Sequence, residues 1–302
     1  MHGRDNMKIV LVIIYYNELR YLEKLFSSLL NQTQKPDNII FINNNSPDDP
    51  SDIIREYSTK LNIDYIRTNK NLFFAKGTNV GLRIALKFNT DIIGCMNSDM
   101  WCAPNMIEQI KKEFTNTNVV ALTPNIRDLE NTKDIFHPMI RGGFFGHNDP
   151  KLVTIGTDCY TDFLTGASLF VRSDTLRKTG LFYEPYIHGT EDFELCDRIR
   201  DLGKMKYIYS TNIYHQSDPS KKVGFSFERK RQSSKNWYIY CLRNKKSNLI
   251  LLGFAMIKNL FESAIGKEDA RAQLLGKLDG IKETMFHLIN NNKYLEEGMH
   301  DN

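Results

Sequence analysis

Segment 91–101, DIIGCMNSDMW, changes character at its midpoint. Residues 92–96 are apolar on both faces of an extended chain, which is typical of a strand in a parallel sheet covered by helices on both sides. Asn97, Ser98 and Asp99 follow at once. Open α/β sheets bind ligands at the carboxyl ends of their strands. Asp99 is therefore a candidate ligand for a divalent cation that holds a phosphate, and the alternative is a polar turn that only ends the strand.

Strands and helices alternate along the first hundred residues. Apolar β-rich runs lie at 8–16, 38–43 and 63–67, and each precedes apolar residues at helical spacing, the last of them in a helix at 78–88. This alternation predicts βαβ crossovers and a parallel sheet. We expect an α/β fold in which helices flank a mainly parallel, Rossmann-like central sheet.

Regular patterns are sparser after Trp101. A helix at 104–114 and a short strand at 119–123 are predicted, whereas 125–160 carries little periodicity. An irregular stretch of this length is either a loop over a site or an ordinary surface excursion.

Small residues mark the next predicted strand, at 163–172. Gly166 and Ala167 leave room there for a ligand or another backbone to approach. A helix then begins at Thr190 with Glu191 and Asp192 in its first turn, where carboxylates are ordinary partners of the helix dipole. The helix start is expected to keep Asp192 ionised.

A last strand is predicted at 205–214, and it ends on His215. A single histidine at a strand end is most often a surface residue, so its role depends on its neighbours.

Composition indicates a globular chain. Of its 302 residues, 41% are hydrophobic and 11% aromatic, and no apolar run approaches the roughly 18 residues that span a bilayer. Residues 1–6 are polar and are interpreted as disordered or as a remnant ahead of the fold. The five cysteines are scattered without a CxxC pair, which favours a reducing cytoplasm over a disulfide framework or a zinc site.

The positive charge belongs to the C-terminal region. Residues 221–302 carry 15 Lys/Arg and 9 Asp/Glu, although the whole chain has a net charge of only +4. Aromatic residues are interleaved with this charge, and an apolar run follows at 249–257. The pattern suits an anionic membrane surface, and the alternative is a helical tail packed on the rest of the protein. Nucleic acid is disfavoured as a partner because the first 220 residues are slightly acidic and contain no recognition module.

A series of short segments, taken in order, resembles the family-2 type of inverting nucleotide-sugar glycosyltransferases of GT-A fold, particularly the bacterial rhamnosyltransferase-like branch. The tail segment 274–280 resembles the helical tail of that branch. The segments that carry the resemblance are 14–18 (IYYNE), 43–48 (NNNSPD), 71–81 (NLFFAKGTNVG), 97–99 (NSD), 165–168 (TGAS), 190–198 (TEDFELCDR) and 214–215 (YH).

The resemblance implies a GT-A domain at 7–220 and a basic, mainly helical extension at 221–302. It implies metal-dependent transfer, with inversion, of a sugar from a dTDP- or UDP-sugar to a saccharide or lipid-linked saccharide. The setting would be bacterial cell-surface polysaccharide synthesis, and rhamnose is one candidate sugar. The cofactor would be Mn²⁺ or Mg²⁺, and the enzyme would be cytoplasmic or peripheral on the inner face of the plasma membrane.

The resemblance also assigns roles to residues. Asp192 is the implied catalytic base, Asp99 and His215 are the implied metal ligands, and Glu191, Gly166 and Ala167 lie on the acceptor side. An inverting transfer needs a base to take the proton of the attacking hydroxyl, and a cation stabilises the departing diphosphate. The implied nucleotide-binding residues are Ile14, Tyr15, Tyr16, Asn17, Glu18, Asn43, Lys76, Gly77, Asn79, Asn97 and Ser98.

Two positions depart from the family pattern. Asn43 stands where relatives often have Asp, so the identity of the nucleobase is left open, because an amide both donates and accepts hydrogen bonds. Asn97 replaces the first Asp of the metal motif, which puts more weight on Asp99. The main alternative function is a non-catalytic nucleotide-sugar or saccharide binder on the same fold. A nicotinamide-dependent dehydrogenase is disfavoured because no GxGxxG follows the first strand.

Overall fold

The structure of the chain is a computed structural model. It describes residues 7–128, 133–134, 139–140, 151–152, 156–187, 189–215, 226–243 and 249–289. The remnant expected at 1–6, most of the irregular stretch 125–160 and the expected domain boundary at 220 lie outside these residues.

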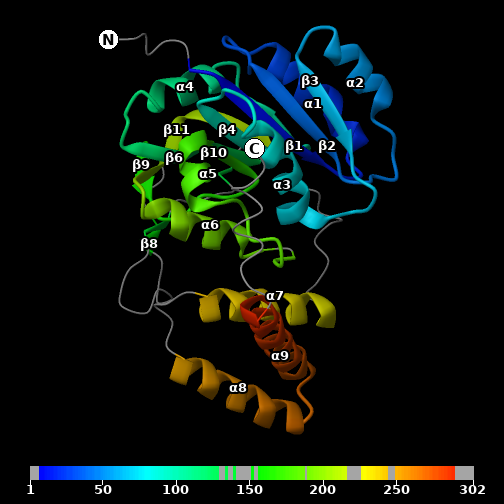
Figure 1. Cartoon of the computed structure of the whole chain (residues 1–302), viewed down its shortest axis with the longest axis vertical. Helices are drawn as coiled ribbons and strands as arrows, with labels where there is room; N and C mark the ends of the chain where they lie inside the picture. The colour runs from blue at the N-terminus through cyan, green and yellow to red at the C-terminus, as the bar shows by residue number, and fades with distance from the viewer. Residues whose placement is uncertain are drawn as a thin grey trace.

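The first part of the chain forms the predicted succession of strands and helices (Figure 1). Strand β1 pairs in parallel with β2 and with β4, and β2 pairs in parallel with β3. The elements are β1 (Ile9–Tyr15), α1 (Leu19–Leu30), β2 (Asn38–Asn43), α2 (Ser51–Ser58), β3 (Ile63–Arg67), α3 (Phe73–Ala85) and β4 (Ile92–Asn97).

The apolar run of β1 explains why helices cover both faces of this sheet. Its alternate residues enter two different cores: Ile9, Leu11 and Ile13 join one, and Val10 and Val12 join the other. Successive side chains of a strand point to opposite faces, so a run without polar residues requires a layer on each side. Helices α1, α2 and α4 supply buried residues to the first core, and α3, α5 and α6 supply them to the second.

The second part of the chain completes the sheet, in the order β3-β2-β1-β4-β10-β6-β11-β5 with β9 on β11. Strand β10 is antiparallel to both β4 and β6, and β11 is antiparallel to β5. The elements are β5 (Met100–Cys102), α4 (Met106–Glu113), β6 (Val119–Asp128), β7 (Met139–Ile140), β8 (Lys151–Leu152), β9 (Cys159–Thr161), β10 (Ser168–Arg172), α5 (Ser173–Thr179), α6 (Glu191–Arg200) and β11 (Lys204–His215).

Three element boundaries differ clearly from the sequence predictions. The short strand predicted at 119–123 continues to Asp128 as β6. The strand predicted at 163–172 begins only at Ser168, because residues 165–167 form a turn in which the Ala167 N–H donates to Thr165 Oγ1 at 3.3 Å. The helix predicted from residue 78 begins at Phe73. Side chains from outside this helix satisfy its start: the Leu72 N–H donates to Asn44 Oδ1 at 2.9 Å, and the Phe73 N–H to Asn71 Oδ1 at 2.8 Å.

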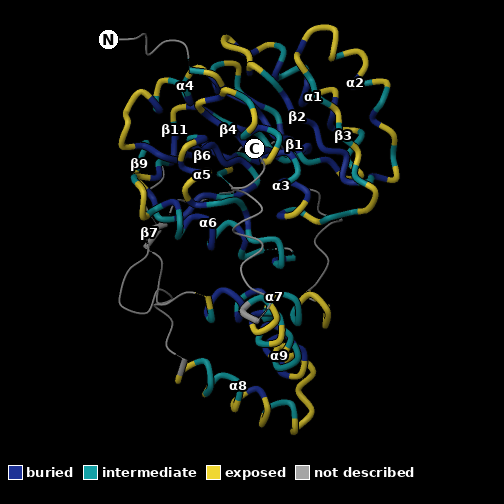
Figure 2. Tube along the Cα trace, viewed as in Figure 1, coloured by how far each residue is buried: buried dark blue, intermediate teal, exposed yellow. Residues whose placement is uncertain are grey.

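Three further helices form the C-terminal part: α7 (Phe227–Arg243), α8 (Leu249–Ala264) and α9 (Glu268–Ile289). They lie beyond α6, with α7 nearer to α6 and α8 at the far end of the molecule (Figures 1 and 2). Helices α7 and α9 pack closely because glycines face the partner backbone. A Cβ on Gly276 would come within 2.1 Å of the Arg231 carbonyl oxygen.

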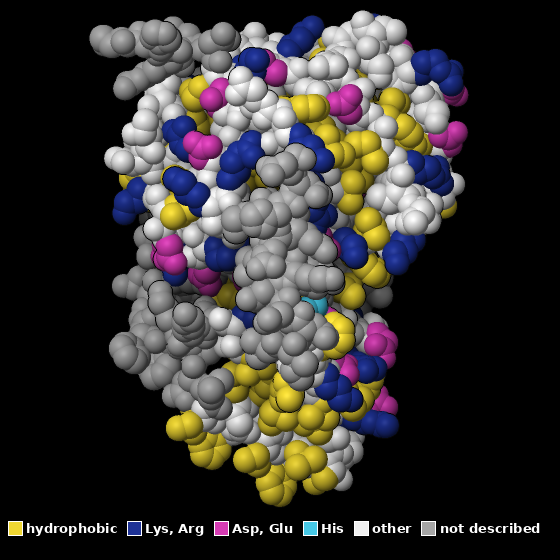
Figure 3. Space-filling view, viewed as in Figure 1, with side chains coloured by type: hydrophobic (Ala, Val, Ile, Leu, Met, Phe, Trp, Pro, Cys, Tyr) yellow, Lys and Arg dark blue, Asp and Glu magenta, His cyan; other side chains and the backbone are white. Residues whose placement is uncertain are grey.

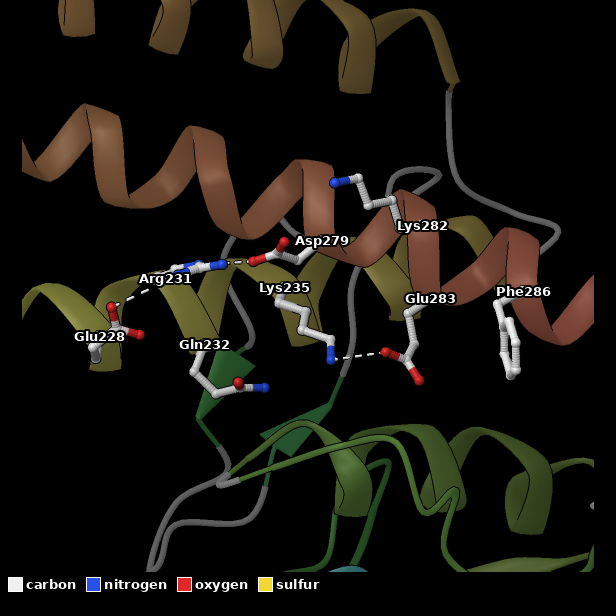
Figure 4. Close-up of a pocket in the computed structure, with 8 residues that line it drawn as sticks. All are labelled: Glu228, Arg231, Gln232, Lys235, Asp279, Lys282, Glu283 and Phe286. Carbon is white, nitrogen blue, oxygen red and sulfur yellow. Dashed lines mark hydrogen bonds and ion pairs between the residues drawn. The ribbon is translucent and has the colours of Figure 1, made fainter.

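The described basic residues of α7 are largely paired with acidic residues of α9. Lys230 Nζ lies 2.5 Å from Asp269 Oδ1, Arg231 Nε lies 2.7 Å from Asp279 Oδ2, and Lys235 Nζ lies 3.0 Å from Glu283 Oε2. Two of these pairs border an open hollow between α7 and α9, which contains none of the predicted site residues (Figure 4). Figure 3 shows that hydrophobic side chains instead gather at the end of the molecule formed by α8.

Candidate active site

The loops that follow β1 and β2 are held together by polar side chains. The Asn17 N–H donates to Ser46 Oγ at 2.7 Å, and the Leu19 N–H donates to Asp48 Oδ2 at 3.0 Å. Asn17 has a φ of +56°, a left-handed conformation that asparagine tolerates better than most residues. Burial beside Asp48 raises the pKa of Tyr15, so its hydroxyl stays protonated.

Asn43 is fully buried at the end of β2, and both ends of its amide are engaged. Its Nδ2 donates to the Tyr65 hydroxyl at 2.8 Å, and its Oδ1 accepts from the Ser46 N–H at 2.8 Å. The amide keeps a second N–H and a second acceptor lone pair, but the side chain has no exposed surface in this structure. Ile14 and Tyr16 occupy the same end of β1, where Tyr16 is exposed.

The predicted residues of α3 are brought to the same edge of the sheet. Gly77 faces Ile14, and a Cβ at this position would lie 2.6 Å from Ile14 Cδ1. Asn79 is buried and holds the segment after α5, because its Nδ2 donates to the Phe182 carbonyl at 2.8 Å. Lys76 is half exposed, and its Nζ lies 3.8 Å from Glu184 Oε2. Of the three, Lys76 is the residue with a side chain still able to reach a ligand.

The Asn97–Asp99 turn lies between β4 and β5, and it meets His215 through strand pairing. Met100 of β5 is opposite His215 of β11, which brings His215 Nε2 to 3.2 Å from Asp99 Oδ2. Ser98 is buried, and its Oγ donates to Glu18 Oε2 at 2.5 Å. The structure thus brings together Glu18, Ser98, Asp99 and His215. These four predicted residues come from three distant segments of the chain.

Buried oxygen atoms in this turn suit a hard cation. Asp99 Oδ1 and Asn97 Oδ1 are buried without a hydrogen-bond partner among the described residues. Buried acceptors are rarely left in this state unless water or an ion binds them. Among the described residues no cluster of three or more His, Cys, Asp or Glu side chains is suited to a metal. Asp99 and His215 can therefore supply part of a coordination shell, which a diphosphate and water would complete.

Asp192 lies at the start of α6, beside the turn that precedes β10. The Gly166 N–H donates to Asp192 Oδ2 at 3.3 Å, and the Phe193 N–H donates to Oδ1 at 3.1 Å. Burial nevertheless raises the pKa of Asp192, although these backbone amides oppose the shift. The amides therefore favour the charged form of the carboxylate, as its helix position predicts, but burial outweighs them and raises the pKa of Asp192 above its ordinary value.

Glu191, next to Asp192, is also buried and has a shifted pKa. It is 7% exposed, and its Oε2 is buried without a hydrogen-bond partner among the described residues. Burial, together with the nearby charge of Asp192, raises the pKa of Glu191 to about 7. The two adjacent carboxyl groups are thus in different environments.

Gly166 and Ala167 connect the two parts of the site. Gly166 donates its N–H to Asp192, and the next residue, Ala167, accepts the Asn97 N–H at 3.1 Å. A Cβ on Gly166 would come within 2.9 Å of the Phe74 ring. These two small residues therefore place the carboxylate of Asp192 next to the Asn97–Asp99 turn.

Asn236 of α7 is a site-supporting residue that the sequence did not reveal. It is fully buried, and its Nδ2 donates to the carbonyls of Ile187 and Gly189, each at 2.7 Å. These carbonyls belong to the segment before Asp192, where Gly189 and Thr190 have φ values of +110° and +80°. A single Asn within a polar helix carries no sequence signal of this contact.

The fold and this arrangement are those of a GT-A glycosyltransferase: a mixed sheet whose first strands are parallel, a polar turn after the central strand β4, and a partly buried carboxylate beside that turn. The sequence profile of glycosyl transferase family 2 matches residues 10–171, which is more than half of the chain. The chain belongs to this family.

Relatives and solved structures agree with this assignment. The chain is 26% identical over 273 residues to hyaluronan synthase of Pasteurella multocida, covering 80% of this chain and 27% of that protein. It is 20% identical to the low-salt glycan biosynthesis hexosyltransferase Agl10 of Haloferax volcanii, over 92% of each chain. The chain thus spans about a quarter of the length of the hyaluronan synthase that it matches.

Two similar structures contain nucleotides. S. aureus TarS 1–349 in complex with UDP has a TM-score of 0.58 at 16% identity, covering 79% of this chain and 67% of that one. GalNAc-T7 with UDP, GalNAc and Mn²⁺ has a TM-score of 0.66 at 13% identity, covering 97% and 59%. At these identities the likeness concerns the fold.

The pKa of Glu191 gives a pH-dependent prediction. Because its folded-state pKa lies above the ordinary 4.5, the folded protein holds this proton more tightly than the unfolded chain does, so stability falls as pH rises from 4.5 to about 7. The shift corresponds to about 3 kcal/mol. Between pH 4.5 and 7.5, the unfolding free energy of the wild type should therefore fall by about 3 kcal/mol more than that of Glu191→Gln. Urea titrations of both proteins without nucleotide or metal will measure it, and a pH-independent difference would contradict the buried environment.

Proposed function

We propose that the protein is an inverting glycosyltransferase that moves a sugar from a UDP- or dTDP-sugar to a saccharide or lipid-linked saccharide acceptor in polysaccharide synthesis. The observation that carries this proposal is the connection of Asp192 to the Asn97–Asp99 turn through Gly166 and Ala167. Relatives named as hyaluronan synthase and hexosyltransferase, and neighbours solved with UDP or UDP-GlcNAc, support it. Rhamnose is one candidate sugar. Among the described residues no helix is long and apolar enough to cross a bilayer.

Asp99 and His215 are the proposed protein ligands of a divalent cation. A carboxylate oxygen and an imidazole within 3.2 Å of each other suit Mn²⁺, which accepts nitrogen more readily than Mg²⁺ does. A neighbour solved with Mn²⁺ supports this choice. A cation at this position would offset the charge that develops on the departing diphosphate.

Asp192 is the proposed base. As the acceptor oxygen bonds to the anomeric carbon, the bond from that carbon to the diphosphate oxygen breaks, and the hydroxyl proton passes to Asp192. A carboxylate with a raised pKa is a better proton acceptor than an ordinary aspartate, because the ideal base titrates near the working pH. Glu191, which shares the turn, is proposed to orient the acceptor.

The domain division and the location of the protein are also proposals. We place the catalytic domain at 7–220 and the helical extension at 221–302, in a cytoplasmic enzyme that is peripheral on the inner face of the plasma membrane. The gathering of hydrophobic side chains on α8 supports the membrane association (Figure 3).

Removing the proposed metal ligand should uncouple nucleotide binding from the cation. Asp99→Ala should weaken binding of UDP in the presence of Mn²⁺ by on the order of a hundredfold, because the carboxylate is the main anionic ligand. His215→Ala should have a smaller effect. Calorimetry with and without EDTA measures both, and Asp52→Ala, whose side chain is 93% exposed on α2, is the matched control. UDP binding that is unchanged by EDTA would remove the metal assignment.

Replacing the carboxylate of Asp192 with an amide should strongly reduce turnover without weakening the binding of the donor. Asp192→Asn keeps the shape and an acceptor oxygen for the Gly166 N–H, so donor binding should stay within about twofold while kcat falls on the order of a hundredfold or more. Initial rates beside calorimetry separate the two. A variant that turns over within a few-fold of wild type would exclude Asp192 as the base. A wild type that binds donor but transfers to none of a panel of acceptors would favour the non-catalytic binder.

Asn236 should affect the rate through the segment before Asp192. Asn236→Ala leaves the carbonyls of Ile187 and Gly189 without their donor, so kcat should fall about tenfold while the KM for the donor stays within about twofold. Gln232→Ala is the matched control, because Gln232 contacts Asn236 but not that segment. A loss of thermal stability with unchanged kcat would show that Asn236 has only a structural role.

A further inference from the structure

Helix α8 exposes large apolar side chains along its whole length. Ile250 is 70% exposed, Phe254 63% and Phe261 70%. Leu251, Ile257, Leu260 and Ile265 are exposed as well, so exposed apolar residues recur at helical spacing and continue one residue past the helix end. We call them the outer face of α8; Figure 3 shows this end of the molecule covered by hydrophobic atoms.

The side of α8 that faces α9 is polar. Asn259 is 4% exposed, and its Nδ2 donates to Gln273 Oε1 at 2.9 Å. Lys277 of α9 is also buried, and its Nζ donates to the Ala255 carbonyl at 2.8 Å and to Asn259 Oδ1. Leu252 packs against the buried cluster that includes Ile239 of α7, but most of the large apolar side chains described on α8 are exposed, whereas the apolar stripe of a helix in a water-soluble protein faces the core.

We infer that α8 is a membrane-contact helix that lies in the plane of a lipid bilayer with its outer face among the acyl chains. Exposed apolar surface on this scale is rare on soluble monomers and marks an interaction surface. A helix of 16 residues is about 24 Å long, which is too short to cross a hydrocarbon layer of roughly 30 Å but sufficient to lie at its boundary.

The chemistry of the outer face favours lipid over a second copy of the chain. Interfaces between proteins carry about one hydrogen bond per 100–200 Å² and a polar rim. Among the exposed residues of α8, Lys258 is the charged side chain on the outer face. Acyl chains require no hydrogen bonds, and a lysine at the edge of an apolar face can extend its ammonium group to the headgroups.

The driving force should be apolar rather than electrostatic. Three of the described basic residues of α7, Lys230, Arg231 and Lys235, are paired with acidic residues of α9, which leaves them less available to anionic lipid. Lys267 at the end of α8 is paired with Glu262. Binding should therefore occur on neutral vesicles too and persist when salt screens the surface charges. This inference does not depend on the proposed glycosyl transfer.

Co-sedimentation of the full chain with vesicles tests the inference. The vesicles are phosphatidylcholine with and without phosphatidylglycerol, each at low and high salt. We expect the wild type to sediment in all four conditions, and the partition coefficient of F254Q/F261Q to fall on the order of tenfold or more. The matched control is Y160Q/L202Q, because Tyr160 and Leu202 are 52% and 45% exposed on the catalytic domain. This control should bind as the wild type does, and thermal unfolding should show that both variants fold.

Any of the following results would overturn the inference. The first is a wild type that does not sediment with any vesicle. The second is an F254Q/F261Q variant that binds like wild type, or a wild type that binds anionic vesicles alone and is released by salt. The third is a wild-type dimer in light scattering that F254Q/F261Q converts to monomer while neither protein binds vesicles, which would assign the outer face to a second copy.

Discussion

The antiparallel pairing of β10 with β4 is the contact on which the candidate site depends. Its register sets Ser168 opposite Met96, so the chain must cross the carboxyl end of β4 at Gly166 and Ala167. There the Gly166 N–H donates to the Asp192 carboxylate, and the Ala167 carbonyl accepts the Asn97 N–H. Phe74 fills the space next to Gly166, so a larger residue would force these two bonds apart. The need for small residues at this turn is thus steric as well as functional.

Much of the fold could be predicted because the strands of the first half are buried on both faces. A run such as 8–16 has few alternatives once it lacks polar residues, and the family assignment and GT-A fold drawn from the ordered motifs are confirmed. The turn at 165–167 was missed because a run of small and apolar residues suits a strand as well as a close backbone approach. The start of α3 was missed because one of the N–H groups there is accepted by Asn44, which is far away in the chain.

In the site, too, features set by local sequence could be predicted, whereas features set by tertiary contacts could not. Asp99 could be located from an abrupt change of polarity after a buried strand. Its contact with His215 needs the pairing of β5 with β11, which no local pattern contains, and the two were linked only through the family resemblance. The helix start that favours a charged Asp192 is visible in the sequence, whereas the burial that raises its pKa is not. Asn43 and Asn79 donate hydrogen bonds within the protein, and their contact with a nucleotide stays a prediction.

Burial separates the behaviour of the two adjacent carboxyl groups at the start of α6. Asp192 receives N–H groups from Gly166 and Phe193, which favour its charged form, whereas Glu191 has a buried oxygen without a partner among the described residues. Two neighbouring carboxylates resist ionising together, so the proton is held preferentially by the less solvated one. The pKa of about 7 at Glu191 therefore helps to keep Asp192 in the charged form that a base requires.

The C-terminal helices connect this acidic turn to the proposed membrane surface by direct packing. Asn259 of α8 bonds to α9, the glycines of α9 allow close contact with α7, and Asn236 of α7 bonds to the segment before Asp192. A site held in this way keeps a fixed height above a bilayer in which α8 lies, because packed helices are stiff where a linker is not. A lipid-linked acceptor is itself anchored at that surface. The height of Asp192 would then favour acceptors whose terminal sugar reaches it, so the helical extension would contribute to acceptor selection without touching the sugar.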